Sequence, residues 1–116
     1  WSRDLARMAA HIIVQCEAEA KGRALAEALA ETSGVYHAAG GGETTWHGFA
    51  AEAVRLAQER SLETRLAKIE AITTSEYPTA AKRPTNSRLN CDKLARRFGW
   101  SMMDWRESLR QVVAEL

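Results

Sequence analysis

The chain has 116 residues, of which 46% are hydrophobic and 27% are charged, and its formal net charge at pH 7 is +1. This is the composition of an ordinary soluble globular protein, with one domain's worth of chain at most. A net charge so close to zero gives no general attraction to nucleic acid or to an anionic membrane. No apolar run approaches the ~20 residues of a membrane span, so we expect neither nucleic acid nor a membrane as a partner.

The first and last thirds of the chain each contain one cysteine, Cys16 and Cys91, with no CxxC pair. This spacing favours reduced thiols and a cytoplasmic location over a disulfide scaffold. Nothing at the start has the pattern of a signal peptide. The first residue is Trp1 rather than Met, and it leads directly into a helical pattern, so we expect this chain to be part of a longer protein.

The first helix is predicted at residues 2–20, where Leu5, Met8 and Cys16 belong to an apolar stripe with three- and four-residue steps. Ser2 is the predicted N-cap of this helix. Residues 23–32 are rich in helix formers but have only a thin apolar face. They are predicted to form a short surface helix or an ordered connection.

Two short strands are predicted next, at residues 35–39 and 66–72, with a helix between them. A strand, a helix and a second strand form a βαβ unit, which favours an α/β fold. Because about three or more strands are needed for an independently stable sheet, we expect these strands to join a sheet outside this chain.

The helix between the strands is predicted to start at Thr44 or Thr45 and to bury a stripe that includes Trp46 and Phe49. The glycine triplet at residues 40–42 precedes it, in a position where phosphates often bind. The triplet lacks the lysine of a GxxxxGK[ST] loop and does not match GxGxxG. A turn that requires positive φ is therefore the favoured interpretation.

Three capped segments are predicted after residue 72. Thr73 and Glu76 form a capping box for a short turn, and Asn90 caps a helix that ends at Gly99. A second capping box, Ser101 with Asp104, is predicted at the start of the last helix. The predicted buried stripe of this helix consists of Trp105, Leu109, Val112, Val113 and Leu116.

Neither a metal site nor a catalytic site is predicted in this chain. His11, His37 and His47 do not combine with the two cysteines in any spacing typical of zinc sites. No carboxylate pair lies in an apolar setting that would raise a pKa for acid catalysis. The histidines are therefore interpreted as structural or partly exposed side chains.

Residues 82–97 carry six basic side chains and one acidic one, a local net charge of +5 in a nearly neutral chain. Guanidinium, amide and hydroxyl groups in one loop can bind phosphate oxygens. The segment therefore predicts an anion or nucleotide-diphosphate site, with a plain solvated face as the alternative. A nucleic-acid site is disfavoured because exposed aromatic residues are not interleaved with the charges. The polar loop residues are Lys82, Arg83, Asn86, Ser87 and Arg88.

Five motifs follow one another along the chain. They are GVYHAAGG at 34–41, TTWH at 44–47, YPT at 77–79, RPTNSRL at 83–89, and FGW at 98–100 followed by DW at 104–105. Their order resembles the C-terminal third of the dTDP-4-dehydrorhamnose reductases, which belong to the extended short-chain dehydrogenase/reductase group. The resemblance covers essentially the whole chain.

The resemblance implies that residues 1–116 are the C-terminal substrate-binding portion of an α/β enzyme, mostly helices with two or three short strands. The N-terminal Rossmann domain of the family would then be missing from this chain. The parent would convert dTDP-4-dehydro-L-rhamnose to dTDP-L-rhamnose with NADPH or NADH, bound by that missing domain. Neither Tyr36 nor Tyr77 has a lysine four residues later, so the family's Tyr-x-x-x-Lys pair is absent and the fragment alone is expected to be inactive.

The resemblance also implies a dTDP-sugar as the bound substrate, and it adds weight to the basic loop as its site. The first candidates for substrate binding are Arg83, Asn86 and Ser87, followed by Lys82 and Tyr77.

Two other functions stay open at this stage. The parent could be another sugar-nucleotide reductase or epimerase of the same group, or a non-catalytic binding subunit on this fold. Some family members are thought to dimerise through magnesium held by glutamates. Arg3 lies near the corresponding position here, so we expect no metal-bridged dimer.

Overall fold

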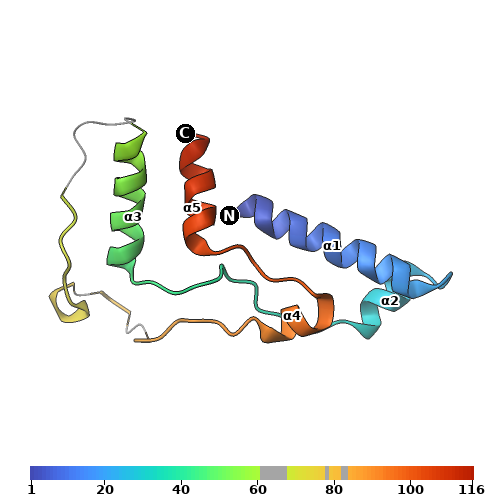
Figure 1. Cartoon of the computed structure of the whole chain (residues 1–116). Coiled ribbons are helices and arrows are strands. Elements are labelled where there is room, and N and C mark those ends of the chain that lie inside the picture. The colour runs from blue at the N-terminus through green and yellow to red at the C-terminus, as the bar shows by residue number, and fades with distance from the viewer. Residues whose placement is uncertain (61–67, 78, 82–83) are drawn as a thin grey trace. The chain divides into compact units, whose positions relative to one another are not determined.

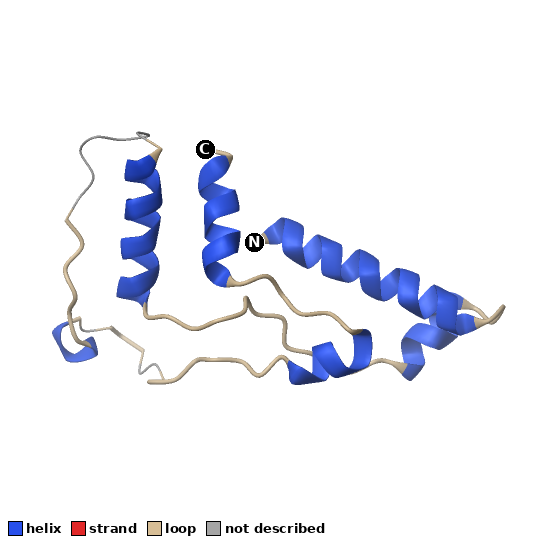
Figure 2. Ribbon diagram, viewed as in Figure 1, coloured by secondary structure: helices blue, strands red, loops and turns tan. Residues whose placement is uncertain are grey.

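Helices make up the regular secondary structure of the chain in the computed structural model (Figures 1 and 2). The structure describes residues 1–60, 68–77, 79–81 and 84–116, and none of these residues lies in a β-strand. In the same ranges, no helix is long and apolar enough to cross a membrane. Contacts between helices and loops, rather than a sheet, therefore position the described side chains.

The chain divides into two compact units. Unit 1 comprises Trp1–Gly41 and Leu89–Met103, and unit 2 comprises Gly42–Arg88 and Asp104–Leu116. Each unit combines two segments that lie far apart in the sequence, so its core depends on non-local contacts.

Unit 1 contains α1 (Ser2–Ala20), α2 (Leu25–Glu31) and α4 (Asp92–Phe98), and α1 packs against α2 (Figure 1). The chain leaves α1 through Lys21 and Gly22, which have φ values of 50° and 88°. Left-handed residues of this kind commonly end helices, and glycine adopts them without a steric cost. The turn lets α2 fold back onto α1.

The core of unit 1 lies between its three helices and the loop that follows α2. Tyr36 from this loop packs against Phe98 with a ring-centroid separation of 5.2 Å, and its hydroxyl donates to the Thr32 carbonyl at 2.9 Å. The apolar stripe predicted for the first helix is confirmed at Cys16, which is fully buried, and at Met8, which packs against the core. The buried residues of this core are Cys16, Ala20, Ala28, Leu94 and Phe98.

Unit 2 contains α3 (Trp46–Glu59), the 3-10 turn η1 (Thr74–Glu76) and α5 (Trp105–Ala114). Figure 1 shows α3 and α5 side by side, and the two helices are in contact. Their core is small, and its members are Leu56, Leu109 and Val113, with Ala53 and Trp105 packed against them.

Several predicted caps are confirmed. The Thr45 hydroxyl accepts the Gly48 N–H at 3.0 Å at the start of α3. Thr73 and Glu76 form the capping box of η1, and Gly99 ends α4 in the left-handed conformation with φ 62°. Local sequence signals therefore located these helix ends correctly.

Three other caps lie one or more residues from their predicted positions. Trp1, not Ser2, is the N-cap of α1. Cys91 is the N-cap of α4, although the Asn90 side chain still accepts the Asp92 N–H at 2.8 Å. The last helix has Asp104 itself as N-cap, so the Ser101 prediction is wrong.

The prediction of mostly helices is confirmed, but the predicted strands at residues 35–39 and within the described residues 68–72 are wrong. Residues 66 and 67 lie outside the described residues. Residues 35–39 are a loop, in which Val35 is 76% exposed rather than buried. The Lys93 ammonium and the Cys91 thiol bond the backbone of this loop, in place of a neighbouring strand.

The prediction that two aromatic residues of α3 are buried is also wrong. Trp46 is 83% exposed and Phe49 is 40% exposed, while the buried residue of this helix is Leu56. The reason is that α5 covers α3 around Leu56 and Ala53, whereas Trp46 lies at the very first residue of the helix. At the other end of unit 2, Leu116 follows the end of α5 and is likewise exposed.

Candidate functional site

The basic loop predicted to bind an anion belongs to unit 2 and follows η1. Tyr77 lies directly after this turn, donates its backbone N–H to the Thr74 carbonyl at 3.3 Å and is 65% exposed. Lys82 and Arg83 lie outside the described residues. The structure therefore describes three of the five predicted substrate-binding residues.

Asn86 organises the end of this loop. Its side-chain oxygen accepts hydrogen bonds from Arg88, at 3.0 Å from the backbone N–H and at 3.2 Å from Nε. Ser87, between them, is exposed. The loop thus presents an amide, a hydroxyl and a guanidinium from three consecutive residues, in a chemical combination suited to phosphate oxygens.

An ion pair joins this loop to the segment that precedes α3. Arg88 Nη1 donates to Glu43 Oε2, across 45 residues of sequence, and both side chains are 65% exposed. Asn86 and Glu43 therefore orient one guanidinium from two sides. Because a guanidinium carries five N–H donors, it can keep both partners and still offer a donor to a further anion.

Two cations further along the basic segment, Lys93 and Arg97, have partners in unit 1. Lys93 donates to the Val35 carbonyl at 2.9 Å and lies 4.2 Å from the Tyr36 ring centroid. Arg97 pairs with Glu19 at 2.7 Å. The basic segment is therefore divided between the two units, with its loop residues in unit 2 and Lys93, Arg96 and Arg97 in unit 1.

The Glu19–Arg97 ion pair favours the charged forms of both side chains. The hydrogen bond from Arg97, with a smaller contribution from Gln15, lowers the pKa of Glu19 to about 2 from its usual 4.5. The same pairing raises the pKa of Arg97. Both groups stay ionised at neutral pH, so the pair acts as a link between α1 and α4 rather than as a proton donor.

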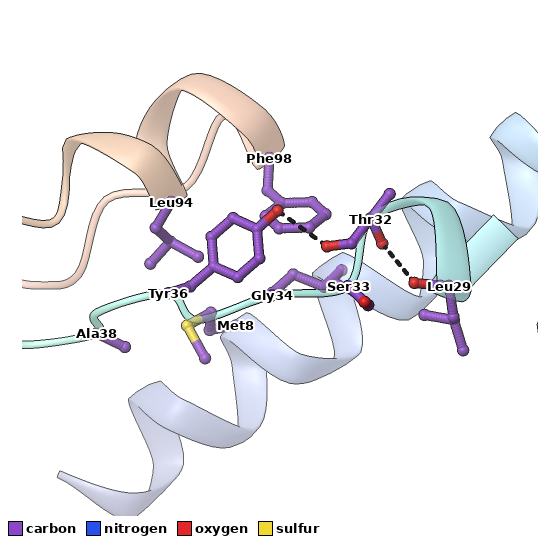
Figure 3. A pocket seen from close by; sticks show the side chains of 10 residues that line it. Met8, Leu29, Thr32, Ser33, Gly34, Tyr36, Ala38, Leu94 and Phe98 are labelled. Carbon is purple, nitrogen blue, oxygen red and sulfur yellow. Dashed lines mark hydrogen bonds between the residues drawn. The ribbon is translucent and has the colours of Figure 1, made fainter.

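An open hollow of about 260 Å³ lies in unit 1, between α1, α2 and α4 (Figure 3). Its walls are mostly apolar, and two of its polar side chains are hydrogen-bonded within unit 1: the Tyr36 hydroxyl donates to the Thr32 carbonyl, and the Thr32 hydroxyl donates to the Leu29 carbonyl. Of the predicted substrate-binding residues that the structure describes, namely Tyr77, Asn86 and Ser87, none lines this hollow. Its chemistry is that of a gap in helix packing rather than of a sugar-nucleotide site.

His11, Cys16 and Cys91 contribute to the packing of unit 1. His11 Nε2 lies 2.8 Å from the Phe98 carbonyl, and the His11 ring lies 4.9 Å from that of Trp100. The Cys91 sulfur accepts the Ala39 N–H at 3.3 Å. Among the described residues, no group of three or more histidine, cysteine or acidic side chains could hold a metal ion.

Two residues of this region were missed or misplaced by the sequence. Glu43 carried no signal, because an acid 45 positions from its partner cannot be paired by spacing. Trp46 was assigned to the core from helical periodicity, although it is exposed beside this loop-to-helix segment. The signal that could have indicated its exposure is its position, because it is the first residue of the helix and directly follows two threonines.

The described residues are helical, and unit 2 carries an exposed polar loop at residues 86–88. The chain belongs to the RmlD substrate binding domain family, whose model matches residues 1–116. The family resemblance drawn from the five motifs is thereby confirmed.

Curated relatives agree with this assignment. A dTDP-4-dehydrorhamnose reductase of Sinorhizobium fredii is 42% identical over 91 residues, which cover 78% of this chain and 30% of the relative. The Burkholderia thailandensis reductase of the same name is 36% identical over 118 residues, or 100% of this chain and 38% of the relative. A dTDP-4-dehydrorhamnose reductase of Escherichia coli is 40% identical over 86 residues, which cover 74% of this chain and 29% of the relative. The chain spans about a third of the length of these relatives.

Proposed function

We propose that this chain is the substrate-binding part of a longer dTDP-4-dehydrorhamnose reductase of the cytoplasm. The observation that carries the proposal is the family match over all 116 residues, supported by the 36% identity with the Burkholderia thailandensis reductase along the entire chain. The parent enzyme would reduce the 4-keto group of dTDP-4-dehydro-L-rhamnose and release dTDP-L-rhamnose.

In this proposal the chain recognises the sugar nucleotide through the loop after η1. The substrate carries a diphosphate, and cations with planar or point-charge donors bind such groups. Arg83 and Lys82 supply the cations, and the Asn86 amide, the Ser87 hydroxyl and the Tyr77 hydroxyl supply neutral hydrogen bonds. Exposure of Tyr77 and Ser87, together with the ordering of the loop end by Asn86, supports this assignment.

The reductant in this proposal is NADPH or NADH, and its site lies outside this chain. A parallel sheet with a glycine-rich strand-to-helix loop holds such a dinucleotide in Rossmann domains, and the described residues contain no strand. They therefore do not fit the cofactor. The Tyr-x-x-x-Lys pair is also missing from the sequence, so we expect no hydride transfer by the isolated chain.

The activity can be tested with the full-length protein that contains this chain. Incubation with NADPH and dTDP-4-dehydro-L-rhamnose should oxidise the cofactor and produce dTDP-L-rhamnose, identified by mass spectrometry and NMR. A parallel reaction with a UDP-linked 4-keto sugar serves as the specificity control. Turnover of the UDP-linked sugar alone would assign the protein to a different sugar-nucleotide reductase, and turnover by the isolated chain would overturn its role as a binding part.

Substrate recognition can be tested in the same full-length protein. Arg83→Ala should weaken dTDP binding about tenfold, because a charge-assisted hydrogen bond to the diphosphate is lost. Arg110→Ala, on α5 and paired with Glu107, is the matched control and should leave the affinity unchanged. An Arg83 variant with the affinity of the unaltered protein would remove Arg83 from the site.

A further inference from the structure

The hollow of unit 1 is larger than the gaps that close packing leaves in a protein core. Its volume is about 260 Å³, whereas protein interiors contain few voids larger than a water molecule. An apolar cavity of about 150 Å³ already holds a benzene ring. The core residues that line this hollow, among them Leu94 and Phe98, therefore lack the atoms that would complete their packing.

The walls of the hollow suit an apolar group. Met8 and Leu29 line it from α1 and α2, and Leu94 and Phe98 line it from α4 (Figure 3). The two hydroxyls on its wall that donate within unit 1 need no further partner to accept their hydrogens. Moving an apolar side chain from water into this space is favourable, whereas a polar group would lose its hydration there.

Apolar residues continue beyond the edge of the hollow. Val35, which lies between the lining residues Gly34 and Tyr36, is 76% exposed. Leu5 is 44% exposed and lies one helical turn before the lining residue Met8 on α1. Exposed apolar surface of this kind marks contacts with other polypeptide, whereas small-molecule pockets enclose about 70–90% of their ligand. The open hollow therefore favours a protein side chain as its occupant.

A cation lies at the edge of the hollow. Lys93 Nζ is 4.2 Å from the centroid of the Tyr36 ring and 3.1 Å from the position that a Cβ at Gly34 would take. The ammonium donates to the Val35 carbonyl at 2.9 Å, and with three N–H donors it can also bind a further acceptor. A side chain that fills the hollow with an acid beside it would gain both apolar contacts and an ion pair.

The length of the relatives indicates where this side chain would come from. The chain spans about a third of the curated reductases that it matches, and the proposed function makes it part of a protein of similar length. A segment of the same polypeptide is held near the hollow at a high effective concentration. It would therefore occupy the hollow in preference to a second copy or a free ligand.

We propose that the hollow of unit 1 is an intramolecular docking site, which receives an apolar side chain with a neighbouring carboxylate from the part of the parent protein outside this chain. The apolar side chain completes the core around Leu94 and Phe98, and the carboxylate pairs with the Lys93 ammonium. This docking site rests on the proposed function only because it requires a longer parent. It is independent of which sugar nucleotide the parent reduces.

The test uses the full-length protein with the photo-crosslinking amino acid p-benzoylphenylalanine in place of Val35. Irradiation and mass spectrometry should show a crosslink within one polypeptide, to a segment outside these 116 residues that has an aspartate or glutamate beside an apolar residue. The same amino acid in place of Glu27, an exposed residue of α2, is the matched control and should not give this crosslink. Crosslinks from position 35 that join two copies, or that stay within these 116 residues, would overturn the docking site.

A second measurement fills the hollow from within the chain. Ser33 lines the hollow and is exposed, so Ser33→Trp should occupy the space that the docked side chain needs. The full-length variant should lose the crosslink from position 35 and melt at least about 3 °C lower, whereas Ser33→Ala should change neither. Lys93→Met should reduce the yield of the crosslink, and Lys93→Arg should retain it. An unchanged crosslink and melting temperature in Ser33→Trp would contradict docking in the hollow.

The outcomes separate this docking site from the proposed function. If the full-length protein reduces dTDP-4-dehydro-L-rhamnose but gives no crosslink from position 35 to the rest of its own chain, the docking site is overturned and the reductase proposal stands. If that crosslink forms in a full-length protein without reductase activity, the docking site stands and the proposed function is overturned.

Discussion

The carboxylate of Asp4 accepts the backbone N–H of Met103 at 3.0 Å, although 99 residues separate them. Asp4 is only 4% exposed and is the one charged residue among the buried positions of the described chain. Met103 also accepts the Gly41 N–H at 2.9 Å. The backbone N–H of Met103 thus binds the start of α1, and its carbonyl binds Gly41. These two hydrogen bonds connect three segments of unit 1 that lie far apart in the sequence.

Replacing Asp4 should therefore destabilise unit 1. Asp4→Ala leaves a partly buried N–H without its acceptor, which costs about 1–3 kcal/mol of unfolding free energy. Asp4→Asn keeps a side-chain oxygen and should lose clearly less. Urea unfolding followed by circular dichroism measures both variants, and equal losses for Ala and Asn would show that the negative charge, not the hydrogen bond, matters here.

Leu94 should be the most sensitive aliphatic position of the same unit. It is 1% exposed in the core between α1, α2 and α4, and Leu→Ala at such sites costs about 3 kcal/mol through lost transfer energy and a residual cavity. Leu116→Ala removes the same atoms from a residue that is 83% exposed, and it should change stability by less than about 0.5 kcal/mol. Denaturant unfolding should separate the two variants, and similar losses would contradict the core assignment.

The sequence predicted the helices of this chain well because their signals are local. Thr45, the Thr73–Glu76 box and Gly99 each act within one helical turn, so spacing alone located them. The apolar stripe of α1 could be predicted for the same reason, since its spacing follows from the period of the helix itself.

The strands and the site could not be predicted in the same way. Apolar residues at 35–39 match a strand, but a strand exists only with a partner ladder, and in unit 1 the side chains of Lys93 and Cys91 occupy that backbone instead. Asn86 was identified from its chemistry and its motif, whereas its link through Arg88 to Glu43 depends on a contact across 45 residues. Trp46 is likewise exposed because α5 packs against α3 around Leu56 and Ala53 and not at the first residue of the helix. The helical period of the sequence does not indicate which part of a helix a neighbouring helix covers.

Glu19 should titrate far below an ordinary glutamate. The hydrogen bond from Arg97, assisted by Gln15, lowers the pKa of Glu19 from 4.5 to about 2. A depressed pKa in the folded state contributes stability that is present above the unfolded value, near 4.5, and is lost as the pH falls toward about 2. Because the pair is solvent-accessible, the stabilisation is small. NMR titration of the carboxyl carbon should show the midpoint returning toward 4.5 in Arg97→Ala and moving less in Gln15→Ala; an unmoved midpoint in Arg97→Ala would contradict the pairing.

Gly42 should tolerate no side chain, for two separable reasons. Its φ of 76° lies in the left-handed region, and a Cβ there would come within 2.6 Å of Asp104 Oδ2 and 3.1 Å of Trp105 Cδ1. Gly22 has a similar φ of 88° but nothing within 4 Å of its Cβ position, so Gly22→Ala carries only the backbone cost of about 1–2 kcal/mol. Gly42→Ala should lose more, because it also displaces the Asp104 side chain that accepts the Arg106 N–H at the start of α5. Unfolding free energies of the two alanine variants measure the difference directly, and equal losses would mean that Asp104 and Trp105 move aside without cost.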